Sequence, residues 1–238
     1  MKKKQIVIRI ILIIAIIALL VYITKELWPV FAQIATEMGR IEFKEDITSL
    51  GFKGIILILG LIIAQVLIPI LPGEPIEILA GMCLGTMGGL FIVLVGALCS
   101  TLLIIGIVKV FGKQFIYVLL NEKTIKKIEN FETNVFNKNE KRIYSIFFLL
   151  FFIPGIPKDI IIYIAAILPI NVLKFTGIAT FARIPSILTS TIAGANLVEG
   201  NWLITIAVYV LMFIIAISTM IIVNKKDKEF IKTVDKIR

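Results

Sequence analysis

Residues 72–77 read Pro-Gly-Glu-Pro-Ile-Glu, and this stretch lies between two long apolar segments. Proline has no backbone donor and glycine tolerates positive φ, so we expect a helix entering the stretch to end there. The pattern returns as Pro-Gly-Ile-Pro-Lys-Asp at residues 154–159, again between apolar segments. A broken apolar helix that carries acids and occurs twice is typical of a transporter built from two repeats, although two similar turns at a membrane surface remain the simpler alternative. The residues predicted to break the helices are Pro72, Gly73, Pro75, Pro154, Gly155 and Pro157.

The composition indicates an all-α integral membrane protein. Of the 238 residues, 59% are hydrophobic, and the mean hydropathy of +1.02 is outside the range of soluble domains. A chain of this length has room for about four or five spanning helices of roughly 20 residues each. The net charge of +9 comes from basic residues that cluster beside apolar segments, which favours a topology signal and contact with anionic lipid over nucleic acid.

Residue types argue against an enzyme. The chain has no histidine, so no histidine base is available for a serine or cysteine nucleophile. The two cysteines, Cys83 and Cys99, lie in apolar surroundings without the spacing of a metal site or a disulfide framework. We therefore expect no metal and no cofactor.

Three parts can be distinguished along the chain. Residues 1–53 combine a lysine-rich start and an apolar helix, interpreted as a retained signal anchor, with an amphipathic helix expected to lie in the membrane interface. Residues 54–197 hold the two motifs and form the predicted core. Residues 198–238 combine a last spanning helix with a basic tail.

The distribution of basic residues predicts the topology. Lysine and arginine gather at the N-terminus, in residues 113–142 and in the tail, which places all three on the cytoplasmic side. If Gly54–Leu71 and Leu90–Phe111 both spanned the membrane, the central basic segment would lie outside. A hairpin from Gly54 to Gly85 that enters and leaves by the outer face removes this conflict, and a hairpin over Ile143–Leu168 would then enter from the inner face. The predicted fold is therefore two inverted re-entrant helical hairpins, each followed by a spanning helix, plus N- and C-terminal spanning helices. Full spanning by Gly54–Leu71, about 27 Å as a helix, stays an alternative.

With these residues identified, the region 54–197 resembles the DedA superfamily, also called SNARE-associated or VTT-domain membrane proteins, and looks closest to its bacterial Tvp-like branch. The chain departs from many relatives in having Phe151 where they have an arginine, Ala166 where they have a glycine, and Lys109 where they have an arginine. The matching pieces are Leu71 to Pro75, Ala80-Gly81, Gly85, Val108 to Gly112, Phe152 to Pro157, Tyr163 to Ala166, Phe175, Pro185 and Gly194.

The resemblance implies a lipid role in a bacterial cell membrane. Members of the superfamily translocate undecaprenyl phosphate or phosphatidylethanolamine in bacteria or scramble phospholipids in eukaryotes, and some depend on the proton-motive force. A lipid translocator of this kind would bind phosphate-bearing lipids and possibly protons. Two alternatives stay open, namely an ion-coupled secondary transporter of a small solute and a membrane scaffold without transport activity.

Five ionisable residues at predicted membrane depth are the candidate site: Glu74, Glu77, Lys158, Asp159 and Arg183. The two glutamates share a helix face and could carry protons, or they could only cap a helix that starts at Ile76. Lys158 and Asp159 lie at the matching position of the second motif and could serve the site or pair with each other. Arg183, predicted deep within one helix, could hold a phosphate through its planar guanidinium or serve as a counter-ion to the carboxylates.

Overall fold

The structure is a computed structural model, and it describes residues 25, 32–33, 36–67, 73–111, 140–152 and 158–226. Several predictions fall on residues outside these ranges. They are the signal anchor, the basic central segment, most of the tail, and the breaking residues Pro72, Pro154, Gly155 and Pro157.

The chain divides into two compact units, Met1–Asp46 and Ile47–Arg238. The first unit contains most of helix α2, which covers Glu37–Ser49 and begins with an acidic first turn. Met38 and Ile41, whose spacing in the sequence predicts the apolar face of the interfacial helix, are both exposed.

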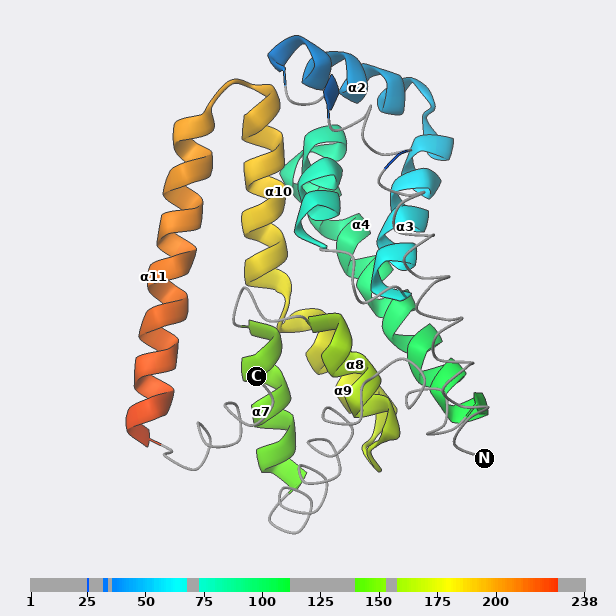
Figure 1. Cartoon of the computed structure of the whole chain (residues 1–238), viewed down its shortest axis with the longest axis vertical. Coiled ribbons are helices and arrows are strands. Elements are labelled where there is room, and N and C mark those ends of the chain that lie inside the picture. The colour runs from blue at the N-terminus through cyan, green and yellow to red at the C-terminus, as the bar shows by residue number, and fades with distance from the viewer. Residues whose placement is uncertain are drawn as a thin grey trace. The chain divides into compact units, whose positions relative to one another are not determined.

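The second unit is built from helices alone in the part of the chain that the structure describes (Figure 1). In Figure 1 the short helices α7, α8 and α9 lie in the lower half of this unit, with α10 above them and α11 alongside α10. The helices are α3 (Phe52–Leu67), α4 (Glu74–Phe111), α7 (Glu140–Phe152), α8 (Lys158–Ile167), α9 (Val172–Phe181), α10 (Ile184–Val198) and α11 (Trp202–Lys226).

Helix α4 reverses its direction at Gly85. This residue has φ 71° and ψ 176°, a conformation open to glycine and strained for other residues. In a straight helix Gly81 and Gly89 would be about 12 Å apart, yet a Cβ built on Gly89 would lie 2.8 Å from the Cα of Gly81. The first part of α4, from Glu74 to Gly85, therefore folds back against the second part.

Within the described residues, three helical segments are long and apolar enough to cross a membrane: Glu74–Val110, Val172–Val198 and Trp202–Thr219. Because of the reversal at Gly85, only the part of α4 that follows this residue can cross, with a length of about 39 Å. The span predicted near Leu90–Phe111 thus corresponds to a helix of suitable length, and the span predicted over residues 172–197 corresponds to α9 and α10 taken together. Helix α3, with 16 residues, is about 24 Å long and shorter than the roughly 30 Å of a hydrocarbon core.

Glycines let α4 and α10 touch along their backbones. A Cβ on Gly81 would lie 2.6 Å from the Cα of Thr191, and a Cβ on Gly194 would lie 2.9 Å from the backbone nitrogen of Met82. Small residues are the usual means of close helix contact in membranes. Gly81, Gly85 and Gly89 are spaced four apart in the sequence, which predicts a ridge of small residues on one helix. This ridge is wrong as a continuous surface, because Gly85 is the turning point and Gly89 packs on Gly81 itself.

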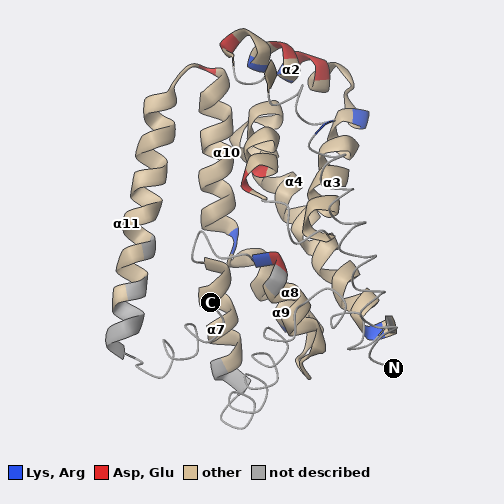
Figure 2. Cartoon of the chain, in the orientation of Figure 1, with Lys and Arg blue, Asp and Glu red and all other residues tan. Residues whose placement is uncertain are grey.

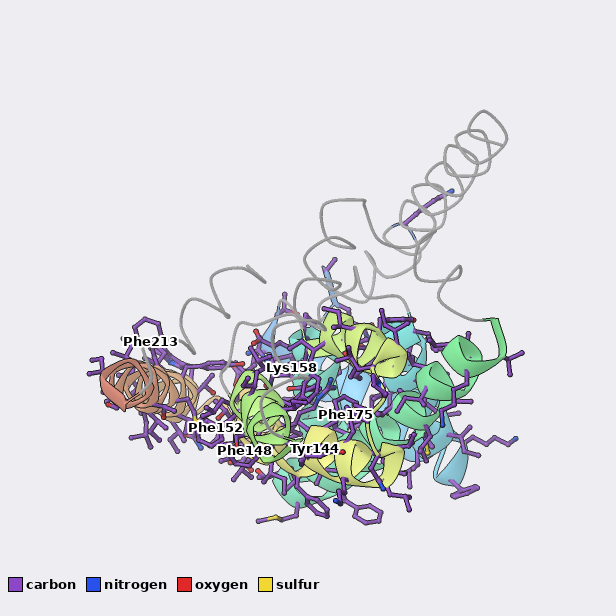
Figure 3. The ribbon with its side chains drawn as sticks, turned by 90° about the horizontal axis from the view of Figure 1, so that it is seen from below. Tyr144, Phe148, Phe152, Lys158, Phe175 and Phe213 are labelled. Carbon is purple, nitrogen blue, oxygen red and sulfur yellow. The ribbon has the colours of Figure 1, made fainter. Side chains whose placement is uncertain are left out.

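Aromatic side chains fill the core between α7 and α9. The ring of Phe175 lies edge-on to Phe147 and Phe151, with centroid distances of 5.0 and 5.8 Å. All three are fully buried, and Figure 3 shows Phe175 inside the unit while Phe213 lies at its periphery on α11. The hydroxyl of Tyr163 in α8 donates to the carbonyl of Leu67 at 2.8 Å, which satisfies an end carbonyl of α3 and ties the two motif-bearing regions together.

Replacing Gly194 with alanine should lower stability. The new Cβ would clash with the Ile78 carbonyl and force α10 away from α4. We expect a loss of about 1–3 kcal/mol in the free energy of unfolding, measured by thermal unfolding in detergent. Gly177→Ala is the matched control, since a Cβ there meets no atom within 4 Å and alanine favours a helix by about 1 kcal/mol. Equal melting temperatures for the two variants would show that the α4–α10 contact is looser than described.

Candidate functional site

The two motifs start two helices whose first turns are charged. Helix α4 begins at Glu74, and the backbone nitrogens of Ile76 and Glu77 both donate to the Gly73 carbonyl at 3.0 Å. The helix thus starts two residues before the predicted Ile76, with Pro75 in its first turn, where a missing N–H costs nothing. Helix α8 begins at Lys158. Figure 2 shows these charged starts and the cationic lower end of α10 in the middle of the second unit, next to helix segments without charged residues.

Asp159 and Arg183 form a largely buried ion pair. The guanidinium Nη2 donates to Asp159 Oδ1 at 3.3 Å, and the two side chains are 14% and 6% exposed. The face of the guanidinium lies over the Phe151 ring, 5.0 Å from its centroid, a favourable cation–π arrangement. Of the partners predicted for Arg183, the structure provides a carboxylate from the second motif.

Lys158 reaches α10 rather than its neighbour Asp159. Its ammonium donates a hydrogen bond to the Ser186 hydroxyl, which in turn donates to the Arg183 carbonyl at 3.1 Å. Electrostatic contact with Glu77 adds a link to the first motif. Figure 3 shows Lys158 directed into the unit. The structure therefore joins the two motifs across α10.

Glu77 and Glu74 differ in their surroundings. Glu77 is partly buried and lies within hydrogen-bonding reach of Ser190 in α10. Tyr209 of α11 lies near the same serine and interacts electrostatically with both glutamates. Glu74 is exposed, although it shares the first turn of α4. Glu77 is thus the glutamate integrated into the charged cluster.

Arg183 lies at a helix break, which corrects the prediction that it stands deep within one helix. Helix α9 ends at Phe181 and α10 starts at Ile184, with Pro185 in its first turn. Proline cannot donate to the preceding turn, so the span predicted over residues 172–197 is interrupted here, as Pro185 in the sequence indicates. The break places the guanidinium beside both motifs.

A cleft borders this cluster. It is narrow, with free space of about 10 Å³, enough for one water molecule, and the residues that line it include Gln65, Gly73, Glu77 and Arg183. Gln65 Oε1 and Arg183 Nε are buried and have no hydrogen-bond partner among the described residues. Buried polar atoms are usually satisfied, so these two mark a place where a ligand or water belongs.

Four residues of the site were not predicted: Gln65, Ser186, Ser190 and Tyr209. Ser186 and Ser190 are four apart on α10, so their hydroxyls share a face. The spacing of these two serines in an apolar helix could have identified them as site residues, whereas a lone glutamine or tyrosine gives no such signal. No group of three or more histidine, cysteine, aspartate or glutamate side chains in the described ranges is placed to hold a metal ion.

Comparison with known proteins gives one family and one relative. The VTT domain matches residues 71–196. An uncharacterized protein of Bacillus subtilis (strain 168), YqeD, is 28% identical over 182 residues, covering 76% of this chain and 83% of the relative. No solved structure matches the chain significantly. The matched region contains Glu74, Glu77, Lys158, Asp159 and Arg183.

Replacing Asp159 with leucine should destabilise the protein by about 3 kcal/mol, because Arg183 would stay buried without its carboxylate. The double variant Asp159→Leu/Arg183→Met should recover most of this loss, since an apolar pair of similar volume carries no uncompensated charge. Thermal unfolding in detergent measures both. Glu199→Leu is the control, because that carboxylate is exposed and should change stability by less than about 0.5 kcal/mol. Additive losses in the double variant would show that the pair is not coupled.

Proposed function

We propose that this chain, which belongs to the VTT-domain family of DedA-type membrane proteins, moves a phosphate-bearing lipid between the leaflets of a bacterial cell membrane. The candidate substrates are undecaprenyl phosphate and phospholipids. The proposed role requires binding and release and no covalent step.

The observation that carries the proposal is the meeting of both motifs at one charged cluster. Asp159 pairs with Arg183, and Lys158 reaches Ser186 while lying in the field of Glu77. Ionisable groups in apolar helices are costly and usually serve substrate or ion pathways. Guanidinium and ammonium groups are also the usual partners of phosphate oxygens.

The reversal of α4 supports an inverted pair of re-entrant hairpins. Helix α3 and the first part of α4 flank the first motif, and α7 and α8 flank the second. Helices α7 and α8 have 13 and 10 residues, about 20 and 15 Å, so neither crosses a hydrocarbon core alone. Entry of the two hairpins from opposite faces would bring their charged tips together near the membrane midplane, as in transporters with inverted repeats. Both termini would then be cytoplasmic.

The charge balance supports proton coupling. The buried charges Glu77 and Asp159 balance Lys158 and Arg183 when all four are ionised, and the exposed Glu74 adds a negative charge beside them. A phosphate would add further negative charge to this cluster. Uptake of a proton with the lipid would remove this repulsion, and Glu77, near Lys158 and Ser190, is the best-placed carrier.

The exterior of α11 suits an amphiphile. Its side chains are mostly apolar and exposed, among them Leu203, Ile206, Val210 and Phe213, while Tyr209 on the same helix approaches the cluster. A lipid could therefore keep its tail against an apolar surface while its head group contacts the charges. A small solute would make no use of this surface.

Translocation of a fluorescent lipid phosphate in proteoliposomes tests the proposal. The wild type should move the lipid, and Arg183→Lys should bind it severalfold more weakly while melting nearly unchanged, because lysine keeps the charge and loses the planar fork. Glu199→Leu serves as the control, because Glu199 is exposed and lies at the opposite end of α10 from Arg183. Solute uptake without lipid movement would favour the secondary-transporter alternative, and movement of neither would favour a scaffold.

The pH profile of transport tests the proton carrier. Glu77→Gln should abolish transport or remove its pH dependence, because glutamine cannot release a proton. Glu74→Gln should leave the pH dependence in place, since Glu74 is exposed and outside the hydrogen-bonded part of the cluster. Transport rates measured over a series of pH values compare the two variants with the wild type. Loss of pH dependence in Glu74→Gln alone would reverse the assignment.

A further inference from the structure

Gln65 is a buried polar residue of α3 whose side-chain oxygen lacks a partner. The residue is 6% exposed, and Oε1 accepts no hydrogen bond among the described residues. A Cβ on Gly73 would lie 2.9 Å from this oxygen, so glycine at this position leaves the carboxamide its space beside the first motif. A buried amide oxygen without a hydrogen bond is costly, so we expect a partner in the cleft that Gln65 lines.

Arg183 brings an unpaired donor to the same cleft. It is 5% exposed, and its Nε has no partner in the described part of the chain. Its Nη2 donates to Asp159, so the ion pair leaves Nε unsatisfied. Glu77 also lines the cleft, and its carboxylate oxygens can accept further hydrogen bonds. The cleft therefore combines one unpaired donor, one unpaired acceptor and one carboxylate.

The size and the chemistry of the cleft select its occupant. Free space of about 10 Å³ holds one water molecule and is too small for a phosphate group. A cation there would face the Arg183 guanidinium, and an anion would face Glu77 and the amide oxygen, so an ion of either sign would meet repulsion and leave one unpaired atom unsatisfied. Water both donates and accepts, and a buried water typically makes about three hydrogen bonds. It can accept from Arg183 Nε and donate to Gln65 Oε1 and to Glu77.

We infer that the cleft is a binding site for one structural water molecule, which joins Gln65 of α3 and Glu77 of α4 to Arg183. The water completes the hydrogen bonds of a buried guanidinium whose other contacts are Asp159 and the face of Phe151. It also ties α3, which leads into the first motif, to the start of α10. This role goes beyond the proposed function and does not depend on it, because the water stabilises the site whether or not a lipid is transported.

Thermal unfolding of Gln65→Met in detergent distinguishes a cleft that holds water from a dry one. Methionine keeps the size of the side chain and is only a weak acceptor. If the water is bound, the variant loses one of its hydrogen bonds, and the melting temperature should fall by about 2–4 °C in a chain of this length. If the cleft is dry, the substitution removes an unpaired buried oxygen and should raise stability. An unchanged or higher melting temperature would therefore overturn the inference.

Thr180→Val is the matched control, because Thr180 Oγ1 is also buried and unpaired among the described residues but belongs to α9 and does not line the cleft. This variant should not lower the melting temperature, since it removes a polar atom without removing a bound water.

A density map of the full chain, at a resolution that shows ordered waters, tests the site directly. Wild type and Thr180→Val should show one peak about 3 Å from both Gln65 Oε1 and Arg183 Nε, and Gln65→Met should lack it. A dry cleft, or a direct hydrogen bond between Gln65 and Arg183, would overturn the inference. A melting temperature that changes when sodium or chloride is replaced at constant ionic strength would assign the site to an ion and overturn it as well.

Discussion

The backbone contact between α4 and α10 is the constraint on which the charged cluster depends. Helix α4 carries Glu77 and α10 carries Ser186 and Ser190, so these groups meet only because Gly81 and Gly194 let the two helices touch. Close contact gains dispersion energy, which is the main source of helix association where the surrounding lipid is as apolar as the side chains. The same contact keeps polar side chains within reach of one another. In this protein, the contact that packs α4 against α10 also assembles the site.

Much of the architecture follows from sequence because its causes are local. The helix starts at Glu74 and Lys158 follow from proline and glycine in the motifs, and the interruption near Arg183 follows from Pro185. The reversal at Gly85 was expected as the end of the first hairpin. Its glycine was nonetheless assigned to a packing ridge, because a glycine that turns the chain and a glycine that packs a helix look alike in sequence.

The partners within the site were less predictable. The five ionisable residues were identified because charges are rare in apolar segments, but sequence left open whether Arg183 meets a phosphate or a carboxylate. The answer, Asp159, depends on where α8 lies against α10, which is a tertiary property. The same holds for Gln65, whose unpaired oxygen is visible only once the cleft is assembled. Phe151 stands where many relatives have an arginine, and the structure gives this difference a meaning, because the Phe151 ring lies against the Arg183 guanidinium.

The turn at Gly85 also sets an order for biosynthesis. The segment from Glu74 to Gly85 is about 18 Å long, too short to be held in a bilayer by its own apolar length. Its packing partners Thr191 and Gly194 are synthesised only after the second motif has left the ribosome. Until then the acids of the first motif have no cations from the second half of the chain beside them. The segment from Glu74 to Gly85 therefore reaches its final packing late, as a long-range step of folding.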